Sequence, residues 1–382
     1  MTALEPLRRA VVIESGKRRV SKIAAGLFGA ENTDIIPAVG LRPCGPSIDT
    51  SAALESATRS HQSAFGTFAK AAFLRGQANW LHARLQRASA DCLVVWNGIK
   101  GHRRLAADIA AAQGITVIFL EEAPLPGRLT VDFKGVNYGN SLPRRADFYA
   151  QWVRQSGAST DGWRQIGGGI VPRQAKSGRD IGQVAADSDL GNEPYIFVPL
   201  QVPGDSQITV YGDWIKSVDH MIDVLHTASA ALPDGWSIRI KEHPSAKDSF
   251  SDKLSALSGA KFRVDNQTNT MAQVAAARGV ITINSSVGFE AFFCDVPVLV
   301  LGHAFYGFGD MATKVESPAA LQEWLRTPDA LGFDAEARGT FCTYLDQVYF
   351  PREDAILSGA YTVQNLVERE RQAADILSGL AG

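Results

Sequence analysis

Residues 279–302, GVITINSSVGFEAFFCDVPVLVLG, predict a buried strand, a tight turn, a short helix and a second buried strand. The apolar, β-branched start and the apolar end are typical of strands covered on both faces. Asn284, Ser285 and Ser286 in the turn are residue types that cap helices, and Gly288 lets another group approach the backbone. Such a turn offers N–H groups, hydroxyls and a positive helix end to an anion. An ordinary strand–helix–strand unit explains the same pattern, and this stretch alone does not choose between them.

Length and composition limit the class of protein. At 382 residues the chain is long enough for two domains, and 45% hydrophobic with 20% charged residues is typical of a globular protein. The net charge of −2 argues against a nucleic-acid partner, because phosphates require a basic face. The four cysteines are far apart and form no CxxC pair, so neither a disulfide framework nor a zinc site is indicated.

The sequence also bears on the compartment. No apolar run approaches the roughly 20 residues that span a bilayer, and the N-terminus lacks the apolar core of a signal peptide. We therefore expect a cytoplasmic protein whose contact with a membrane is peripheral. Lys17, Arg18, Arg19 and Lys22 form a basic patch, which is either a solvated loop or a surface for an anionic substrate or an acidic membrane.

The order of elements predicts an α/β fold. Short apolar runs alternate with helical patterns, which is typical of parallel sheets with helices on their faces. The predicted strands are 9–14, 33–37, 91–96, 115–120, 195–200, 236–241, 262–264, 279–283 and 296–301. A Gly-, Ser- and Asp-rich segment from about 155 to 193 reads as a connection between domains. We predict two Rossmann-like domains that face a central cleft, residues 1–185 and 186–345, and C-terminal helices, residues 346–382, that cross back to the first domain.

Polar residues gather after these strands, where ligands bind in open parallel sheets. In the second half they include Gln201, Asp205, Glu242, His243, Asn284, Ser285 and Ser286, and in the first half Asn97, Gly98, Glu121 and Glu122. Pro244 holds His243 extended, so its imidazole either donates to a phosphate or closes a loop. Glu290, one helical turn past Ser286, suits the two hydroxyls of a ribose, or it is a solvated helix residue.

Two carboxylates are candidates for chemistry. Asp205 stands in a Pro-Gly turn and is ordinarily a turn former. Glu121 follows an apolar strand, where partial burial raises a carboxyl pKa and allows acid catalysis. Glu122 is the alternative, because only one of the two neighbours can point into the cleft.

Several motifs occur together in this chain. They are WNG at 96–98, the segment 121–145, PLQVPGDSQI at 199–208, EHP at 242–244, INSSVGFEA at 283–291 and VPVLVLGHAFY at 296–306. In combination they resemble the bacterial capsule polysaccharide synthesis family and, more narrowly, its retaining β-Kdo transferases. The resemblance covers about residues 91–310. It implies a GT-B-like fold whose first domain meets the acceptor, and transfer of Kdo from CMP-β-Kdo to a glycan or lipid-linked acceptor with retention of the β anomer. The setting would be capsule or O-antigen (lipopolysaccharide) synthesis, at the inner membrane or beside other polysaccharide transferases.

The resemblance also implies roles for residues. CMP would lie in the C-terminal half, with Ser285, Ser286 and His243 at its phosphate and Glu290 at its ribose. Further nucleotide-binding candidates are Gln201, Asn284 and Lys241. Asp205 would be the nucleophile at the anomeric carbon and Glu121 the acid/base that deprotonates the acceptor hydroxyl, while His243 would assist the departing phosphate. No metal or other cofactor is expected, because helix N–H groups and His243 would take its place.

The remaining substrate contacts are open. Asn97 is a candidate for the acceptor side, and Lys134, Asn137 and Arg144 are candidates for the Kdo carboxylate, among which spacing does not choose. A non-catalytic nucleotide-sugar binding module would need the serines but neither Asp205 nor Glu121. A sialyltransferase or a sugar-nucleotide epimerase of similar two-domain shape is a further alternative.

Overall fold

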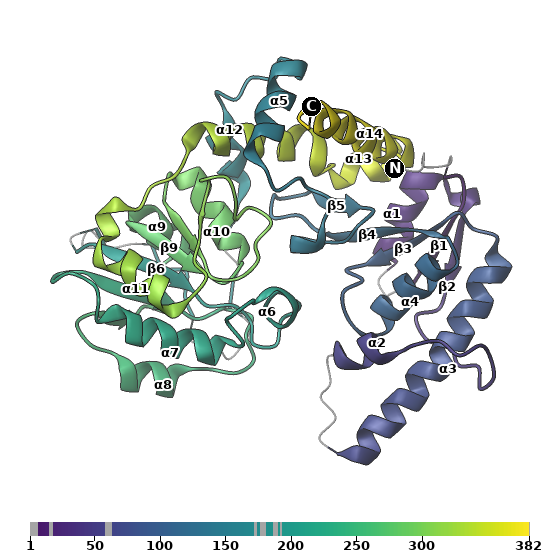
Figure 1. Cartoon of the computed structure of the whole chain (residues 1–382), viewed down its shortest axis with the longest axis horizontal. Helices are drawn as coiled ribbons and strands as arrows, with labels where there is room; N and C mark the ends of the chain where they lie inside the picture. Colours follow the sequence, from purple (N-terminus) through teal and green to yellow (C-terminus); the bar gives the residue numbers. More distant parts are fainter. Residues whose placement is uncertain are drawn as a thin grey trace. The chain divides into compact units, whose positions relative to one another are not determined.

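The computed structural model describes residues 7–14, 18–57, 63–171, 174–175, 181–185, 190–191 and 193–381 (Figure 1). The chain divides into two compact units. The first unit consists of the described parts of Met1–Ala123, Gly127–Leu142 and Leu345–Gly382, and the second of those of Pro124–Pro126 and Pro143–Tyr344. Of the basic patch, Lys17 lies outside the described residues.

The first unit is built on a five-stranded sheet in the order β2-β1-β3-β4-β5. Its strands are β1 (Ala10–Ile13), β2 (Thr33–Ile36), β3 (Cys92–Trp96), β4 (Thr116–Glu122) and β5 (Leu129–Asp132). Strands β1 to β4 run parallel, and β5 is antiparallel to β4. Because the chain moves outward from β1 in both directions, the strand order reverses between β1 and β3, and ligands bind at such a switch point.

Helices cover both faces of this sheet. They are α1 (Arg19–Phe28), α2 (Ser51–Glu55), α3 (Ala64–Ala88), α4 (Gly101–Ala112), α13 (Glu353–Leu357) and α14 (Val363–Gly379). One face carries α1, α13 and α14, whose Ile23, Ile356 and Leu366 pack in one core with Val12 of β1. The other face carries α2, α3 and α4 in a second core. The C-terminal helices are therefore part of the first unit.

The second unit is built on a six-stranded, fully parallel sheet in the order β11-β10-β9-β6-β7-β8. Its strands are β6 (Tyr195–Pro199), β7 (Ser237–Lys241), β8 (Phe262–Val264), β9 (Gly279–Thr282), β10 (Val298–Val300) and β11 (Thr313–Lys314). Counted from β6, this is the order 3-2-1-4-5-6 of dinucleotide-binding sheets, with the switch point between β6 and β9.

Helices also cover this second sheet on both faces (Figure 1). They are α6 (Ser206–Tyr211), α7 (Val218–Ser229), α8 (Ser251–Leu257), α9 (Thr270–Ala276), α10 (Ser286–Glu290) and α11 (Pro318–Arg326), with α5 (Ala146–Ser156) and α12 (Ala335–Tyr344) beside them. Ile222, Leu254 and Leu325 of α7, α8 and α11 share one core with Ile240 and Ile281 of the sheet. Helices α9 and α10 lie on the opposite face (Figure 1).

The predicted α/β class with two Rossmann-like units is confirmed. Two details differ from the sequence prediction. The segment after Glu121, expected to be a loop, contains β5, which pairs with the end of β4. The predicted domain boundary was near residue 185, whereas the second unit already begins at Pro143. The reason is aromatic packing of α5 on α12, in which the rings of Tyr149 and Phe341 lie 4.9 Å apart.

Candidate functional site

The two central strands of the second sheet end in a pair of buried amides. Gln201 follows β6 and Asn284 follows β9, and they are 7% and 4% exposed. Gln201 Nε2 donates to Asn284 Oδ1 at 3.0 Å, and Asn284 N donates to Gln201 Oε1 at 3.2 Å. Asn284 Nδ2 also donates to the carbonyl oxygens of Gln207 and Tyr211, at 2.8 and 3.1 Å. These predicted nucleotide-binding residues therefore use their polar groups to join the two strand ends.

The turn after β9 is held from several sides. Ser285 N donates to Thr282 Oγ1 at 3.0 Å, and Val287 N donates to Ser285 Oγ at 3.2 Å, which makes Ser285 the N-cap of α10. Tyr306 donates its hydroxyl to Ser285 O at 2.6 Å. A Cβ at Gly288 would lie 2.2 Å from the Tyr306 hydroxyl and 2.8 Å from Thr282 Cγ2, so only glycine fits there. This is the close approach that the sequence predicted.

The same turn presents the other predicted nucleotide-binding residues. Ser286 is half-buried, and its hydroxyl makes no hydrogen bond to any residue that the structure describes. Glu290 ends α10 four residues later and is also half-buried. Burial raises the pKa of Tyr306 well above its usual value, and the nearby charge of Glu290 adds to the shift. The fold thus brings Ser285, Ser286 and Glu290 together beside the switch point.

His243 and Glu242 follow β7, the strand next to β6. Nδ1 of His243 accepts the backbone N–H of Ser245 at 3.0 Å, so the proton of the neutral imidazole is on Nε2. Glu242 is buried, and its carboxylate accepts the N–H of Phe250 at 2.6 Å and Asn266 Nδ2 at 3.1 Å. Glu242 therefore anchors the loop, while the ring of His243 is oriented as a donor through Nε2.

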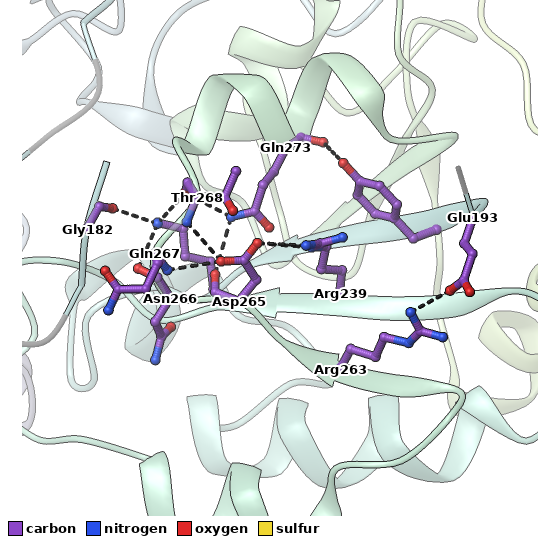
Figure 2. A network of polar contacts seen from close by, with 11 residues as sticks. Gly182, Glu193, Arg239, Arg263, Asp265, Asn266, Gln267, Thr268 and Gln273 are labelled. Carbon is purple, nitrogen blue, oxygen red and sulfur yellow. Dashed lines mark hydrogen bonds and ion pairs between the residues drawn. The ribbon is translucent and has the colours of Figure 1, made fainter. Parts of the chain in front are cut away.

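Lys241, the last residue of β7, is 2% exposed. Its ammonium donates to three carbonyl oxygens, those of Gly182 at 2.8 Å, Asn266 at 3.0 Å and Thr268 at 2.6 Å. Figure 2 shows these three residues gathered at the end of the sheet. Burial lowers the pKa of Lys241 to about 8. All three N–H groups are used inside the unit, so a nucleotide contact by Lys241 would have to displace one of these carbonyls.

The loop after β8 contains a polar network that the sequence analysis did not single out (Figure 2). Asp265 accepts the N–H groups of Gln267 and Thr268 at 3.0 and 2.8 Å and forms an ion pair with Arg239 at 2.8 Å. Burial raises the pKa of Asp265, but the hydrogen bonds from Thr268 and Arg239 outweigh it and hold this pKa below its usual value. The run of Asp, Asn and Thr residues directly after the strand was the available signal.

Asp205 is the N-cap of α6. Its Oδ1 accepts the N–H of Gln207 at 3.0 Å and the hydroxyl of Ser206 at 3.2 Å. Within the described part of the chain, Oδ2 has no hydrogen-bond partner. The structural role that the sequence allowed is therefore present, and one carboxylate oxygen is left over for other contacts.

In the first unit, Asn97 and Glu121 meet at the ends of β3 and β4. Asn97 has φ of +65°, and its Nδ2 donates to Glu121 Oε2 at 2.6 Å. Burial raises the pKa of Glu121, and the Asn97 hydrogen bond partly opposes this shift. Glu122 is exposed and pairs with Arg19, which also binds Glu353 at 2.7 Å. The two neighbouring carboxylates thus lie in different environments, and only that of Glu121 is desolvated.

The three candidates for the Kdo carboxylate do not lie in one unit. Lys134 and Asn137 belong to the first unit, and Arg144 belongs to the second. Asp132 holds the loop of Lys134 by accepting the N–H groups of Lys134 and Ser141 at 2.7 and 2.9 Å. Their role stays a prediction.

Two absences concern the described residues alone. Among them, no group of three or more His, Cys, Asp or Glu side chains is arranged to hold a metal ion. No helix in that part of the chain has the length and apolar character needed to cross a membrane.

The fold and the site define an α/β protein with two Rossmann-like units, whose second unit has a rigid polar turn at its switch point. Residues 170–345 match the model of a family described as capsule polysaccharide biosynthesis protein. The chain is 30% identical over 276 residues to Protein FixF of Sinorhizobium fredii, a match that covers 71% of this chain and 61% of FixF. It is 24% identical over 275 residues to the capsule polysaccharide export protein KpsS of Escherichia coli, covering 59% of this chain and 71% of KpsS. The chain is therefore similar to capsule polysaccharide proteins over part of its length, and it spans less than two thirds of the length of FixF.

Solved structures with a similar arrangement include two from Thermosulfurimonas dismutans KpsC. One is described as a β-Kdo 2,7 transferase, with a TM-score of 0.48 and 14% identity, covering 92% of this chain and 98% of that chain. The other is described as a β-Kdo 2,4 transferase, with a TM-score of 0.49 and 14% identity, covering 89% of this chain and 90% of that chain. TM-scores below 0.5 describe a loose similarity.

Proposed function

We propose that the protein is a glycosyltransferase that moves Kdo from CMP-β-Kdo to a glycan or lipid-linked acceptor with retention of the β anomer, in capsule or O-antigen synthesis. The observation that carries the proposal is the turn at Ser285 and Ser286. It lies at the switch point of a sheet with the strand order of nucleotide-binding folds, inside the segment that matches the capsule family model.

The turn suits the phosphate of CMP for two reasons. The hydroxyl of Ser286 has no partner among the described residues, and the Ser285 turn is fixed before any ligand arrives. Hydrogen-bond donors that are already oriented do not have to be rearranged when an anion binds, so binding carries no reorganisation energy. His243 would add the Nε2 proton to the same phosphate, and Glu290 would accept the ribose hydroxyls. No metal enters this scheme.

Retention would follow from two displacements. In the first, Asp205 Oδ2 attacks the anomeric carbon, the bond from that carbon to the phosphate oxygen breaks, and CMP leaves with the electron pair. In the second, the acceptor hydroxyl attacks the same carbon, its proton passes to a base and the Asp205 carboxylate leaves. Glu121 of the first unit is our candidate for that base. The cap hydrogen bonds to Oδ1 would hold Asp205 in one orientation.

Binding tests the first half of this proposal. Calorimetric titration should show CMP binding and no comparable UDP binding, and Ser286→Ala should weaken CMP binding, since the Ser286 hydroxyl makes no other contact in the described chain. Ser255→Ala is the control, because Ser255 is an exposed serine of α8 outside the candidate site. Tight UDP binding without CMP binding would point to an epimerase and overturn the proposal.

Turnover tests the second half. Consumption of CMP-Kdo with a glycan acceptor should be lost in Asp205→Asn, and mass spectrometry of the wild type after exposure to CMP-Kdo should find Kdo on Asp205. Near-normal turnover in Asp205→Asn would remove the nucleophile assignment. A second candidate is a non-catalytic module that binds a CMP-sugar. It is favoured by the N-cap role of Asp205, because capping α6 accounts for an aspartate at this position without any catalytic role. CMP binding without consumption of CMP-Kdo by any acceptor would support that candidate.

A further inference from the structure

Helix α3 of the first unit begins with exposed apolar residues. Phe65 is 79% exposed and Phe68 is 70% exposed. The buried residues of this helix start only at Leu74, although the helix begins at Ala64. In Figure 1 its first turns lie at the bottom of the view, away from the sheet. Two phenylalanines exposed within one helical turn call for a partner, because isolated apolar exposure is common but clustered aromatic exposure is not.

The exposed residues form a continuous stripe. Positions 65, 68, 72 and 76 follow the spacing of one helical face. At Gly76 this face meets Leu41, since a Cβ at Gly76 would lie 3.4 Å from Leu41 Cδ2. Leu41 is itself 58% exposed, and the N–H of Arg42 donates to Gly76 O at 2.9 Å. Leu41 therefore lies at one end of the helical face that begins with Phe65 and Phe68.

The charged side chains of the helix that carries Phe65 and Phe68 have one sign. Helix α3 carries Lys70, Arg75, Arg84 and Arg87 and no carboxylate. No Asp or Glu occurs between Glu55 and Asp91, although the whole chain has a net charge of −2. Arg75 lies on the exposed side of α3, and Arg42, next to Leu41, is exposed as well. The segment 56–90 therefore carries basic residues and no acidic ones, and two exposed arginines, Arg42 and Arg75, lie beside the apolar residues.

We propose that this surface, formed by Leu41, Phe65 and Phe68 with Arg42 and Arg75, docks on an anionic lipid bilayer. Aromatic side chains insert at the boundary between headgroups and acyl chains, and arginines beside them attract anionic headgroups. A second copy of the chain would bring the same cations against each other. The proposal does not depend on the proposed transferase activity, because it uses no residue of the candidate site.

Vesicle sedimentation with the full chain tests this docking. The wild type should bind phosphatidylcholine vesicles that contain phosphatidylglycerol, and binding should weaken in high salt and with phosphatidylcholine alone. Phe65→Ser with Phe68→Ser should reduce the affinity about tenfold or more. Arg42→Gln with Arg75→Gln should reduce it about fivefold for each cation removed.

Leu357→Ser is the matched control, because Leu357 is 49% exposed on α13 of the same unit and should not affect vesicle binding. Circular dichroism should show that all variants remain folded, since the replaced side chains are exposed. The proposal is overturned if the wild type does not bind the anionic vesicles, or if the double phenylalanine variant binds them equally well. It is also overturned if the wild type is a dimer that the same variant converts to a monomer, because the occupant is then a second copy.

Discussion

The side-chain amide of Gln201 donates to Asn284 Oδ1 at 3.0 Å and joins the ends of β6 and β9. The return bond from Asn284 N to Gln201 Oε1 makes the pairing reciprocal. These two strands flank the switch point of the second sheet, so the pair fixes the distance between the β6 loop and the serine turn. The amides hold the frame of the candidate site, and the serines beside them are left to meet a ligand.

Replacing Gln201 tests this frame. Gln201→Met removes both bonds at similar volume and leaves the N–H and Oδ1 of Asn284 buried without these partners. We expect a loss of about 1–3 kcal/mol in the free energy of unfolding, measured by urea titration. CMP binding should weaken as well, because the turn is no longer aligned with β6. Gln207→Met is the matched control, since the side chain of Gln207 makes no hydrogen bond to the described residues. Equal free energies of unfolding for the two variants would contradict the claim that the Gln201–Asn284 pair stabilises the ends of β6 and β9.

The contact between Gly288 and Tyr306 predicts a paired effect. Gly288→Ala places a methyl group against the Tyr306 hydroxyl and should destabilise the protein by about 1–3 kcal/mol through overpacking. Tyr306→Phe removes that hydroxyl together with its bond to Ser285 O, at a cost of about 1 kcal/mol. The double variant should be less destabilised than the sum of the two, because the clash and the lost bond involve the same oxygen. Strict additivity in a thermodynamic cycle would show that the two residues do not interact.

The environment of Glu121 predicts a pH dependence. Burial raises its pKa, while the Asn97 hydrogen bond lowers it and the charge of Glu122 raises it. Asn97→Ala should therefore raise the pKa of Glu121 further, and Glu122→Gln should lower it. Carboxylate NMR titration, assigned with Glu121→Gln, measures both shifts without any substrate. Shifts of the same sign in the two variants would contradict this account.

The same shift has consequences for activity and for stability. If Glu121 is the base, the acid limb of kcat/KM should follow its pKa to higher pH in Asn97→Ala. Because its raised pKa makes the native state bind the proton more tightly than the unfolded chain, the free energy of unfolding should fall as pH rises through that pKa. Glu121→Gln should remove this part of the pH dependence.

Lys241 should act as a structural residue. Lys241→Met leaves the carbonyl oxygens of Gly182, Asn266 and Thr268 without their donor and should cost at least about 1–3 kcal/mol. The pKa of about 8 is below the usual lysine value, so above pH 8 the native state releases a proton that the unfolded chain keeps. The free energy of unfolding should therefore rise with pH from about 8 to about 10.4, and this rise should vanish in the variant.

Lys253→Met is the control for Lys241, because Lys253 pairs with Asp219 at the surface and such pairs contribute about 0–1 kcal/mol. A stable Lys241→Met protein that no longer binds CMP would instead support the nucleotide-binding role predicted from the sequence. Chemical unfolding and calorimetry on the same samples separate the two roles.

Several features could be predicted from local sequence patterns. The strand predicted at 262–264 matches β8, and the strand predicted at 279–283 matches β9 within one residue, because buried parallel strands are short apolar runs between turn residues. The close approach at Gly288 was predictable for a similar reason, since glycine after a strand indicates a nearby group. Strand β5 was not, because an alternation of only four residues, Leu-Thr-Val-Asp, is too short to distinguish a strand from a loop, and these residues form a strand by pairing with β4.

The sequence by itself determined which residues stand at the strand ends, since period and turn chemistry are local properties of the chain. Only the tertiary structure decided what those residues contact. Lys241 ends strand β7, where a phosphate ligand could stand, yet its three carbonyl partners come from positions 182, 266 and 268, which no local pattern connects with it. Gln201 and Asn284 are separated by 83 positions and meet because β6 and β9 are neighbours in the sheet. Strand order depends on the burial of whole helices and strands, and that is a property of the complete fold.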